Sequence, residues 1–298
     1  MGLLIKNIGK RYGDKKVLSN LSLKCEKGEI IGLLGLNGAG KTTLMKILTG
    51  INSKWDGDIF FNGIDLRKKL KDIQQITGYL PENNPLYNEL FVSEYLLFIS
   101  KLYKVKNPKF EKIISITGLN EYKNHKIEKL SKGCKQRVGI AAAIIHDPEF
   151  LILDEPTTGL DPIQIIEIHK LIKKLGEEKI VIFSSHILQE IEALCNRVIL
   201  LHKGEIILDS SLEKLRNPDE QIINVTFDYR IETEAISRLQ FVETVKNTFE
   251  FEYEILFKTN KDQRSKIFDF AHDNDLKIIN LQHKNKTLEE VFKSLTND

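Results

Sequence analysis

The sequence contains no apolar run long enough to cross a membrane. The longest uninterrupted run covers residues 138–145 and is bounded by Arg137 and His146, whereas a membrane-spanning helix needs about 18 or more apolar residues. The N-terminal segment MGLLIKNIGKRYGDK also lacks the long apolar stretch and the small-residue cleavage site of a signal peptide. We therefore expect a cytoplasmic protein without a membrane span of its own.

Cysteine is scarce, and no sign of charge dominates. The three cysteines, Cys25, Cys134 and Cys195, are far apart and odd in number, which gives neither a disulfide framework nor a zinc spacing and suits a reducing compartment. The net charge is +2, with 33 Lys and Arg against 27 Asp and Glu before residue 220 and 11 against 15 from there on. A basic excess this weak and scattered does not indicate nucleic-acid binding. A merely solvated surface is the safer interpretation of most of these charges.

Strands and helices alternate over the first 215 or so residues. The apolar patterns predict strands over 3–12, 17–25, 29–35, 57–65, 150–154, 179–185, 197–201 and 203–209. Helices are expected over 41–48, 66–75 and 188–194, after Pro162, and within a mainly helical segment at about 89–146. The alternation in the second half of this region indicates an α/β fold with a parallel sheet and crossover helices.

A second, smaller domain is expected after a linker at residues 216–220. The order beyond it is strand 221–229, helix 233–239, strands 242–250 and 252–259, helix 263–273 and strand 276–282, with a last helix at 286–295. The βαββαβ order predicts a small, ferredoxin-like α+β domain. We therefore divide the chain into residues 1–216 and 217–298.

The motif GLNGAGKTT at residues 35–43 is the strongest chemical signal. It matches G-x-x-x-x-G-K-[ST] and lies between a buried strand and a helix, the context in which this motif cradles phosphates. Lys41 would reach the β- and γ-phosphates, and the Thr42 hydroxyl would bind Mg²⁺. The residues that would surround the phosphates are Gly35, Asn37, Gly38, Ala39, Gly40, Lys41, Thr42 and Thr43. The alternative is a glycine turn in a protein that binds no nucleotide.

Two consecutive carboxylates end the buried strand FLILDE. Asp154 can hold a metal ion through its water shell, and Glu155 can polarise an attacking water. A charged pair at a strand end is often only a solvated edge. Because this pair follows a phosphate-binding motif and precedes PTTGLD, a hydrolytic role is the better interpretation.

Taken together, these motifs resemble the ATP-binding cassette (ABC) proteins over the first 215 or so residues. The phosphate loop, LILDEP, TTGLDP and Ser-Ser-His186 occur in the family's order, and LSKGCKQ at residues 130–136 looks like the family's LSGGQ signature. The resemblance implies a P-loop NTPase with a RecA-like parallel core, an antiparallel β subdomain and a helical signature subdomain. It also implies ATP and Mg²⁺ as ligands and a homodimer of the ATPase subunit.

The resemblance assigns roles to further residues. Ser131 and Gly133 would present donors to a γ-phosphate bound by the partner subunit, and Ser131 would cap a helix over 136–145. His186 would contact the γ-phosphate, and Asp161 belongs to the loop that couples the two ATP sites. Tyr12 would stack on adenine, with Val17 against the same base. An ordinary capped helix, a structural histidine and a core aromatic are the plainer alternatives.

Three positions depart from the common family pattern. Lys132 and Cys134 replace the usual Gly and Gln of the signature, and Glu82 stands where a metal-binding Gln is usual. A carboxylate also offers oxygen to a hard cation, so Glu82 can keep the metal role. The variant signature and the glutamate at position 82 both resemble an export branch of the family, the drug-, polysaccharide- and gliding-motility-type ATPases.

The resemblance implies an ATPase subunit that drives a separate transmembrane permease. It favours export as the direction of transport. It also implies a peripheral position on the inner face of the cell membrane. A soluble ABC protein that acts on ribosomes or DNA is the runner-up. Such proteins usually carry two cassettes, long coiled coils or strongly basic arms, which this chain lacks. A small-molecule P-loop kinase would leave the signature unexplained and would need an acceptor pocket.

Overall fold

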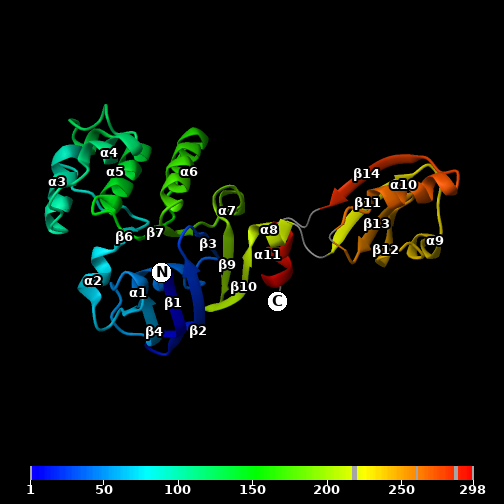
Figure 1. The fold of residues 1–298 in the computed structure, drawn as a ribbon, viewed down its shortest axis with the longest axis horizontal. Coiled ribbons are helices and arrows are strands. Elements are labelled where there is room, and N and C mark those ends of the chain that lie inside the picture. The colour runs from blue at the N-terminus through cyan, green and yellow to red at the C-terminus, as the bar shows by residue number, and fades with distance from the viewer. Residues whose placement is uncertain (1, 217–219, 260, 285–287, 297–298) are drawn as a thin grey trace. The chain divides into compact units, whose positions relative to one another are not determined.

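The computed structural model describes residues 2–216, 220–259, 261–284 and 288–296. It divides the chain into two compact units, residues 1–210 and 211–298 (Figure 1), and each is considered separately below. Residues 217–219 of the expected linker and residues 286–287 of the expected last helix lie outside the described residues. Within the described residues, no helix combines the length and the apolarity that a membrane crossing requires.

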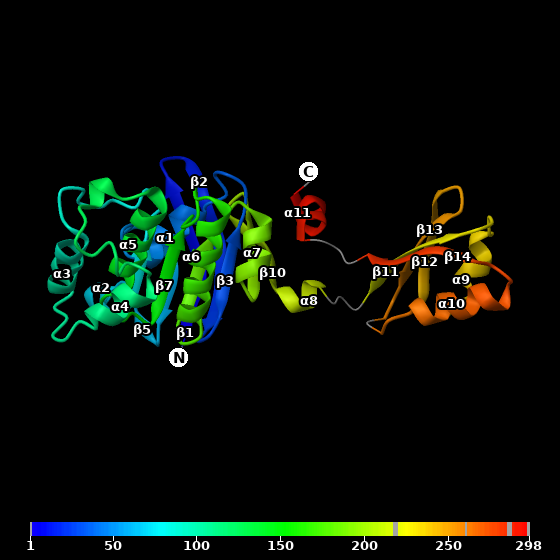
Figure 2. The same cartoon turned by 90° about the horizontal axis from the view of Figure 1, so that it is seen from above.

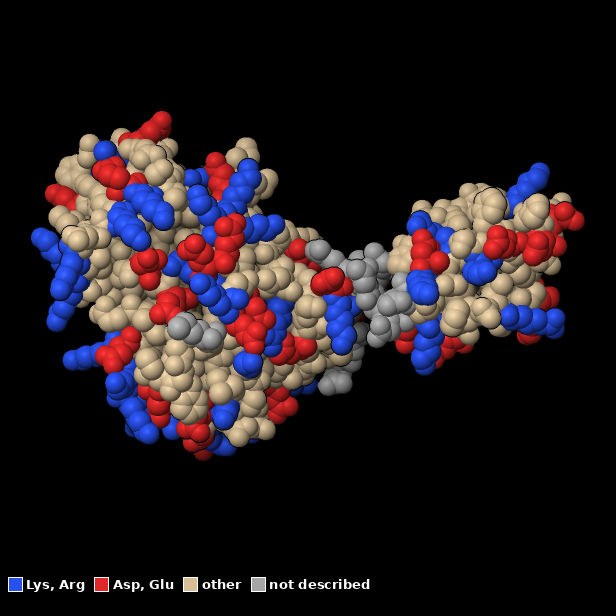
Figure 3. Space-filling model, viewed as in Figure 1, with Lys and Arg blue, Asp and Glu red and all other residues tan. Residues whose placement is uncertain are grey.

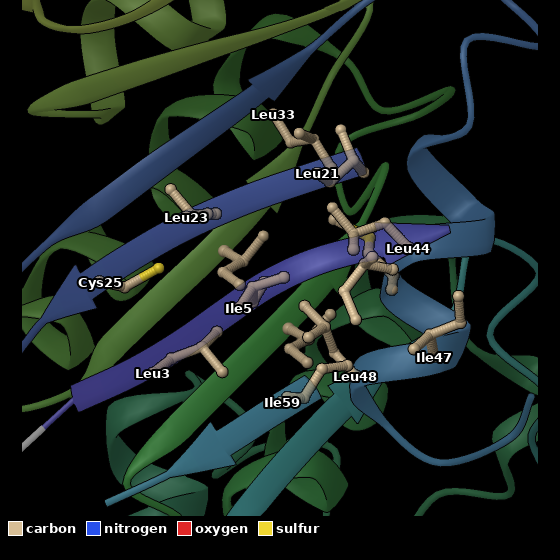
Figure 4. Close-up of a cluster of buried hydrophobic side chains, with 14 of the residues drawn as sticks. Leu3, Ile5, Leu21, Leu23, Cys25, Leu33, Leu44, Ile47, Leu48 and Ile59 are labelled. Atoms are coloured by element: carbon tan, nitrogen blue, oxygen red, sulfur yellow. The ribbon is translucent and has the colours of Figure 1, made fainter. Parts of the chain in front are cut away.

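The first unit begins with an antiparallel sheet. Its strand order is β2-β1-β4-β5, where β1 is Gly2–Tyr12, β2 is Lys15–Glu26, β4 is Asp56–Phe61 and β5 is Ile64–Asp65. Alternate residues of β1 and β2 are buried. Their apolar side chains form one core with Leu44, Ile47 and Leu48 of helix α1, Lys41–Leu48 (Figure 4). This packing fixes α1, and therefore the loop before it, relative to the sheet.

A six-stranded sheet forms the centre of the unit. Its order is β10-β9-β3-β8-β7-β6, with β3 Ile30–Leu34, β6 Thr77–Leu80, β7 Phe150–Asp154, β8 Ile180–Ser184, β9 Arg197–His202 and β10 Glu205–Ser211. Every residue of β3, β7 and β8 is buried, and β6, β7, β8, β3 and β9 pair in parallel, as the continuous apolar runs predict. Helix α6, Pro162–Gly176, packs on β8. Helix α7, Leu188–Leu194, packs on β3 (Figure 2). The short strand β6 was not predicted.

The expected helical segment forms a separate lobe (Figure 1). It contains α3 Val92–Leu102, α4 Phe110–Ile116, a 3₁₀ turn at Ile127–Lys129 and α5 Lys132–Ile144. Helix α5 begins four residues before the predicted Gln136, because the Ser131 hydroxyl accepts a hydrogen bond from the Cys134 amide and caps it there. Helix α2, Leu70–Gln75, is shorter than the 66–75 predicted.

The second unit has the βαββαβ order. After α8, Leu212–Arg216, come β11 Gln221–Phe227, α9 Thr233–Ser237, β12 Val242–Phe249, β13 Glu252–Phe257, α10 Arg264–Asp273 and β14 Ile278–Lys284. The strands form one antiparallel sheet in the order β12-β13-β11-β14, and alternate residues of β11 and β13 pack with Ile236, Ile267 and Ala271 of its helices. Helix α11, Leu288–Thr296, follows.

Candidate functional site

A cleft of about 500 Å³ opens beside the loops that follow β3 and β7. It brings together residues that are up to 174 positions apart, from Tyr12 to His186. Thirteen of the predicted site residues line it: Tyr12, Val17, Asn37, Gly38, Ala39, Gly40, Lys41, Thr42, Thr43, Glu82, Asp154, Glu155 and His186. Lys15 and Thr158 complete the lining.

The loop between β3 and α1 is shaped by glycine. Gly38 and Gly40 have φ values of 82° and 109°, in the left-handed region that other residues rarely adopt. A Cβ on Gly40 would also lie 2.5 Å from a Leu18 methyl carbon. Gly40 is the residue before α1 and offers no side-chain cap, so the positive end of the helix dipole faces the cleft. An anion is the natural partner of such a helix start.

Lys41 is the cation of this loop. Its side chain is buried, and Nζ donates hydrogen bonds to the Gly35 carbonyl at 2.7 Å and to the Leu36 carbonyl at 3.5 Å. Gly35 therefore contributes its carbonyl to the loop and does not line the cleft. Among the described residues, this ammonium bonds to backbone carbonyls and to no anion, which fits a loop that receives phosphate.

The two carboxylates lie at the end of β7, beside β8. Asp154 is 1% exposed, and its Oδ1 accepts a hydrogen bond of 2.7 Å from the Ser184 hydroxyl. The same hydroxyl accepts one of 2.9 Å from the Glu155 amide. Asp154 Oδ2 is buried without a partner among the described residues. A buried carboxylate oxygen without a donor is costly, so this atom fits a position that a hydrated cation would satisfy.

Glu155 and His186 form a pair at the cleft wall. Glu155 Oε2 lies 2.8 Å from His186 Nδ1 and also accepts a 3.3 Å hydrogen bond from the Thr158 hydroxyl. Glu155 has a φ of 49°, in the left-handed region. Strained backbone of this kind gathers at functional sites and persists only where the surrounding structure holds it. The pair brings a carboxylate and an imidazole to the wall of the cleft, where a water in the cleft could contact either group.

Tyr12 stands at the other end of the cleft. Its side chain is 49% exposed, so it is not a core aromatic. The Lys10 ammonium lies 4.8 Å from the ring centroid, and the Tyr12 hydroxyl accepts a 2.8 Å hydrogen bond from Asn52 Nδ2. These contacts orient the ring, which has room to stack on a flat base.

The signature residues lie outside the cleft. Ser131 caps α5 and is exposed, whereas Gly133 is buried, and a Cβ there would lie 2.6 Å from the Gln164 side chain of α6. Asp161 caps α6 by accepting a 2.9 Å hydrogen bond from the Gln164 amide. The cleft of a single chain therefore contains neither Ser131 nor Gly133.

Three residues of the site were missed. Lys15 and Thr158 line the cleft, and Ser184 joins Asp154 to the Glu155 backbone. Ser184 belongs to the Ser-Ser-His motif, so its position at a strand end was a usable signal. Lys15 carries no such signal, because a charged residue at the start of an early strand is usually only solvated.

Comparison with known proteins agrees with this geometry. Residues 18–158 match the family described as ABC transporter. The chain is 33% identical to an uncharacterized ABC transporter ATP-binding protein, YhcH of Bacillus subtilis, over 99% of this chain and 96% of that protein. It is also 33% identical to the linearmycin resistance ATP-binding protein LnrL of Bacillus subtilis, over 99% and 98%.

A solved structure supports the same assignment. The ATP-binding cassette MJ0796, solved as a dimer in a post-hydrolysis state with ADP and Pi, matches 70% of this chain and 98% of its own, with a TM-score of 0.64 and 26% identity. The chain therefore belongs to the ABC transporter family, as an ATP-binding subunit. It is an ATPase with a P-loop nucleoside triphosphatase fold.

Replacement of Lys41 should affect nucleotide binding itself. Lys41→Ala removes the only ammonium of the phosphate loop, so we expect ATP binding to weaken by roughly 10- to 100-fold, as for loss of a charge-assisted hydrogen bond. Equilibrium binding of a fluorescent ATP analogue measures the change. Lys46→Ala, an exposed lysine of the same helix, is the matched control. Unaltered affinity in Lys41→Ala would contradict the phosphate-loop assignment.

Proposed function

We propose that this chain is the motor subunit of an exporter, which binds two ATP molecules at a head-to-tail homodimer interface and drives a separate membrane permease. The observation that carries the proposal is the division of the site. One cleft gathers the phosphate loop, Asp154, Glu155 and His186, whereas Ser131 and Gly133 lie outside it. A site completed by a second copy of the chain explains both facts.

ATP would lie along the cleft between Tyr12 and His186. Tyr12 and Val17 would contact the base, and the backbone of residues 37–43 with Lys41 would hold the phosphates. Glu155 would orient the attacking water and accept its proton, with His186 hydrogen-bonded to the γ-phosphate. The contact between Glu155 and His186 places the two groups on the same side of the cleft.

Mg²⁺ would bind beside the phosphates and neutralise their charge. Thr42, Glu82 and Asp154 line the same cleft, and all three offer oxygen, which this cation prefers. Asp154 has a buried Oδ2 available for a metal-bound water. Glu82 is exposed where it lines the cleft, so its carboxylate would reach the cation from the solvent side.

The permease would contact an apolar surface around α3. Tyr87, Leu97, Phe98 and Leu102 are all exposed there. Beside them a groove of about 590 Å³ is lined by residues that include Ile51, Tyr79, Leu102 and Tyr103. Exposed apolar side chains that cluster in this way mark interaction surfaces. Tyr79 of the groove is three residues before Glu82 of the cleft, so docking at the groove would bring the permease close to the nucleotide.

Export and location are inferred from relatives and from this surface. LnrL is named for linearmycin resistance, which is compatible with outward transport, and it is similar to this chain over nearly its whole length. An export role and a permease contact would together locate the chain on the inner side of the membrane, where the permease would hold it. Residues 217–298 would be an accessory domain. Its charges and those of the ATPase unit are mixed on the face shown in Figure 3, without a field of one sign that would indicate nucleic acid.

Glu155→Gln tests the hydrolytic role. The amide cannot accept a proton, so turnover should fall by roughly 10²-fold or more while ATP affinity is kept. The ATP-bound dimer should accumulate, because hydrolysis would be the step that reopens the interface. Steady-state ATPase assays and size-exclusion chromatography with ATP measure the two effects. Unchanged ATPase activity would remove Glu155 from the mechanism.

Mixed dimers test the shared site. Ser131→Arg should leave ATP binding to the monomer intact and abolish hydrolysis. When Ser131→Arg and Lys41→Ala chains are mixed, both lesions fall on one interface site and the other site is intact, so part of the ATPase activity should return. Each variant alone is the control. If Ser131→Arg weakens monomer binding as much as Lys41→Ala does, the site lies within one chain.

Cell fractionation tests the permease contact. Leu102→Glu places a charge in the apolar groove, so the chain should shift from the membrane fraction to the soluble fraction, with its basal ATPase activity unchanged. Lys129→Glu, a substitution on a 3₁₀ turn outside the groove, is the control. Equal membrane retention of wild type and Leu102→Glu would place the contact elsewhere, and wild type found only in the soluble fraction would favour the soluble ABC factor.

A further inference from the structure

A buried carboxylate lies beneath the site and does not line the cleft. Glu190, in α7, is four residues beyond His186 and 5% exposed. No Lys, Arg or His of the described chain forms an ion pair with it. A carboxylate is almost never buried without a partner, because desolvation of the charge is costly. Its position therefore calls for a specific set of donors.

The donors come from two different loops. Glu190 Oε2 accepts a 2.7 Å hydrogen bond from the Thr157 hydroxyl and a 2.8 Å one from the Ser185 hydroxyl. Thr157 is 3% exposed and Ser185 fully buried. The Ser185 hydroxyl also accepts a 3.0 Å hydrogen bond from the Ile187 amide. One carboxylate oxygen thus joins the loop after β7 to the loop after β8.

The two loops carry the proposed reacting groups. Thr157 follows Glu155 by two residues, and Ser185 immediately precedes His186. Hydrogen bonds to a carboxylate are about twice as strong as neutral ones, and burial protects them from water. The left-handed backbone at Glu155 needs such support from its surroundings.

We propose that Glu190 is a positioning residue for ATP hydrolysis, which holds the loops of Glu155 and His186 at the separation that the reaction requires. The inference rests on the proposed roles of those two residues. Because Glu190 is outside the cleft, it acts on turnover and not on the binding of nucleotide. Its other oxygen, Oε1, is buried without a partner among the described residues, so Glu190→Gln keeps an acceptor for both hydroxyls but loses the charge.

Kinetics of the purified full-length chain test the proposal. Glu190→Ala should lower kcat by roughly 10- to 100-fold, since displacement of a reacting group by about 1 Å can cost that much. ATP affinity, measured with the fluorescent analogue, should stay within about twofold of wild type. The kcat of Glu190→Gln should lie between those of wild type and Glu190→Ala. Gln189→Ala, an exposed neighbour on the same helix, should behave as wild type.

A second variant separates positioning from stability. Thr157→Val and Ser185→Ala combined with Glu190→Leu replace the carboxylate and both of its hydroxyl donors with apolar groups, which can be nearly neutral for stability. We expect a melting temperature near that of wild type and a kcat as low as that of Glu190→Ala. Wild-type kcat in this triple variant would overturn the proposal, because packing alone would then suffice.

The outcomes also distinguish this inference from the proposed function. If Glu155→Gln is inactive but Glu190→Ala keeps both kcat and affinity, the hydrolytic site stands and the positioning role is wrong. If Glu190→Ala weakens ATP binding as strongly as it lowers kcat, Glu190 supports the whole fold and not the two loops. If Glu155→Gln is fully active, the hydrolytic role proposed for Glu155 is wrong, and the inference about Glu190 loses its basis.

Discussion

The site depends on the parallel pairing of β7 with β8. In this register Asp154 is the partner of Ser184, so the hydroxyl of one strand end lies between the carboxylate and the next amide of the other. Both strands are buried throughout, so the Ser184 hydroxyl satisfies Asp154 Oδ1 and the Glu155 amide inside the protein. A shift of the register by one residue would separate Asp154 from Ser184 and leave each of them unsatisfied. Hydrophobic burial of the strands therefore also fixes the polar geometry at their ends.

Much of the site could be predicted because its residues follow buried strands. Apolar runs located β3, β7 and β8, and parallel strands bring their carboxyl ends to one edge, so Lys41, Asp154 and His186 had to meet. Glu190 could not be found in this way. In the sequence it is one of several charged residues of a short helix, and only the packing of α7 against β3 shows that it is buried. The strand β6 escaped notice because four residues are too few to show a period.

One departure from the family pattern, Lys132, lies against a glycine. Lys132 is the first residue of α5, and a Cβ on Gly159 would lie 2.1 Å from its Nζ, so the lysine lies over the loop after β7. Gly133 in turn lies against Gln164 of α6. The two contacts join the signature helix to the loop between β7 and α6. The long side chain at the third signature position thus fits here because the facing residue, Gly159, has no side chain.

The backbone at Glu155 has a wider consequence. Successive side chains of a strand point to opposite faces, yet Asp154 and Glu155 line the same cleft, and the left-handed turn at Glu155 makes this possible. A glycine would adopt that turn with less strain, so the glutamate lowers the free energy of unfolding in order to keep a carboxylate there. Selection for thermal stability alone would favour the loss of this side chain. The glutamate therefore provides a carboxylate for the chemistry at the cost of a lower free energy of unfolding.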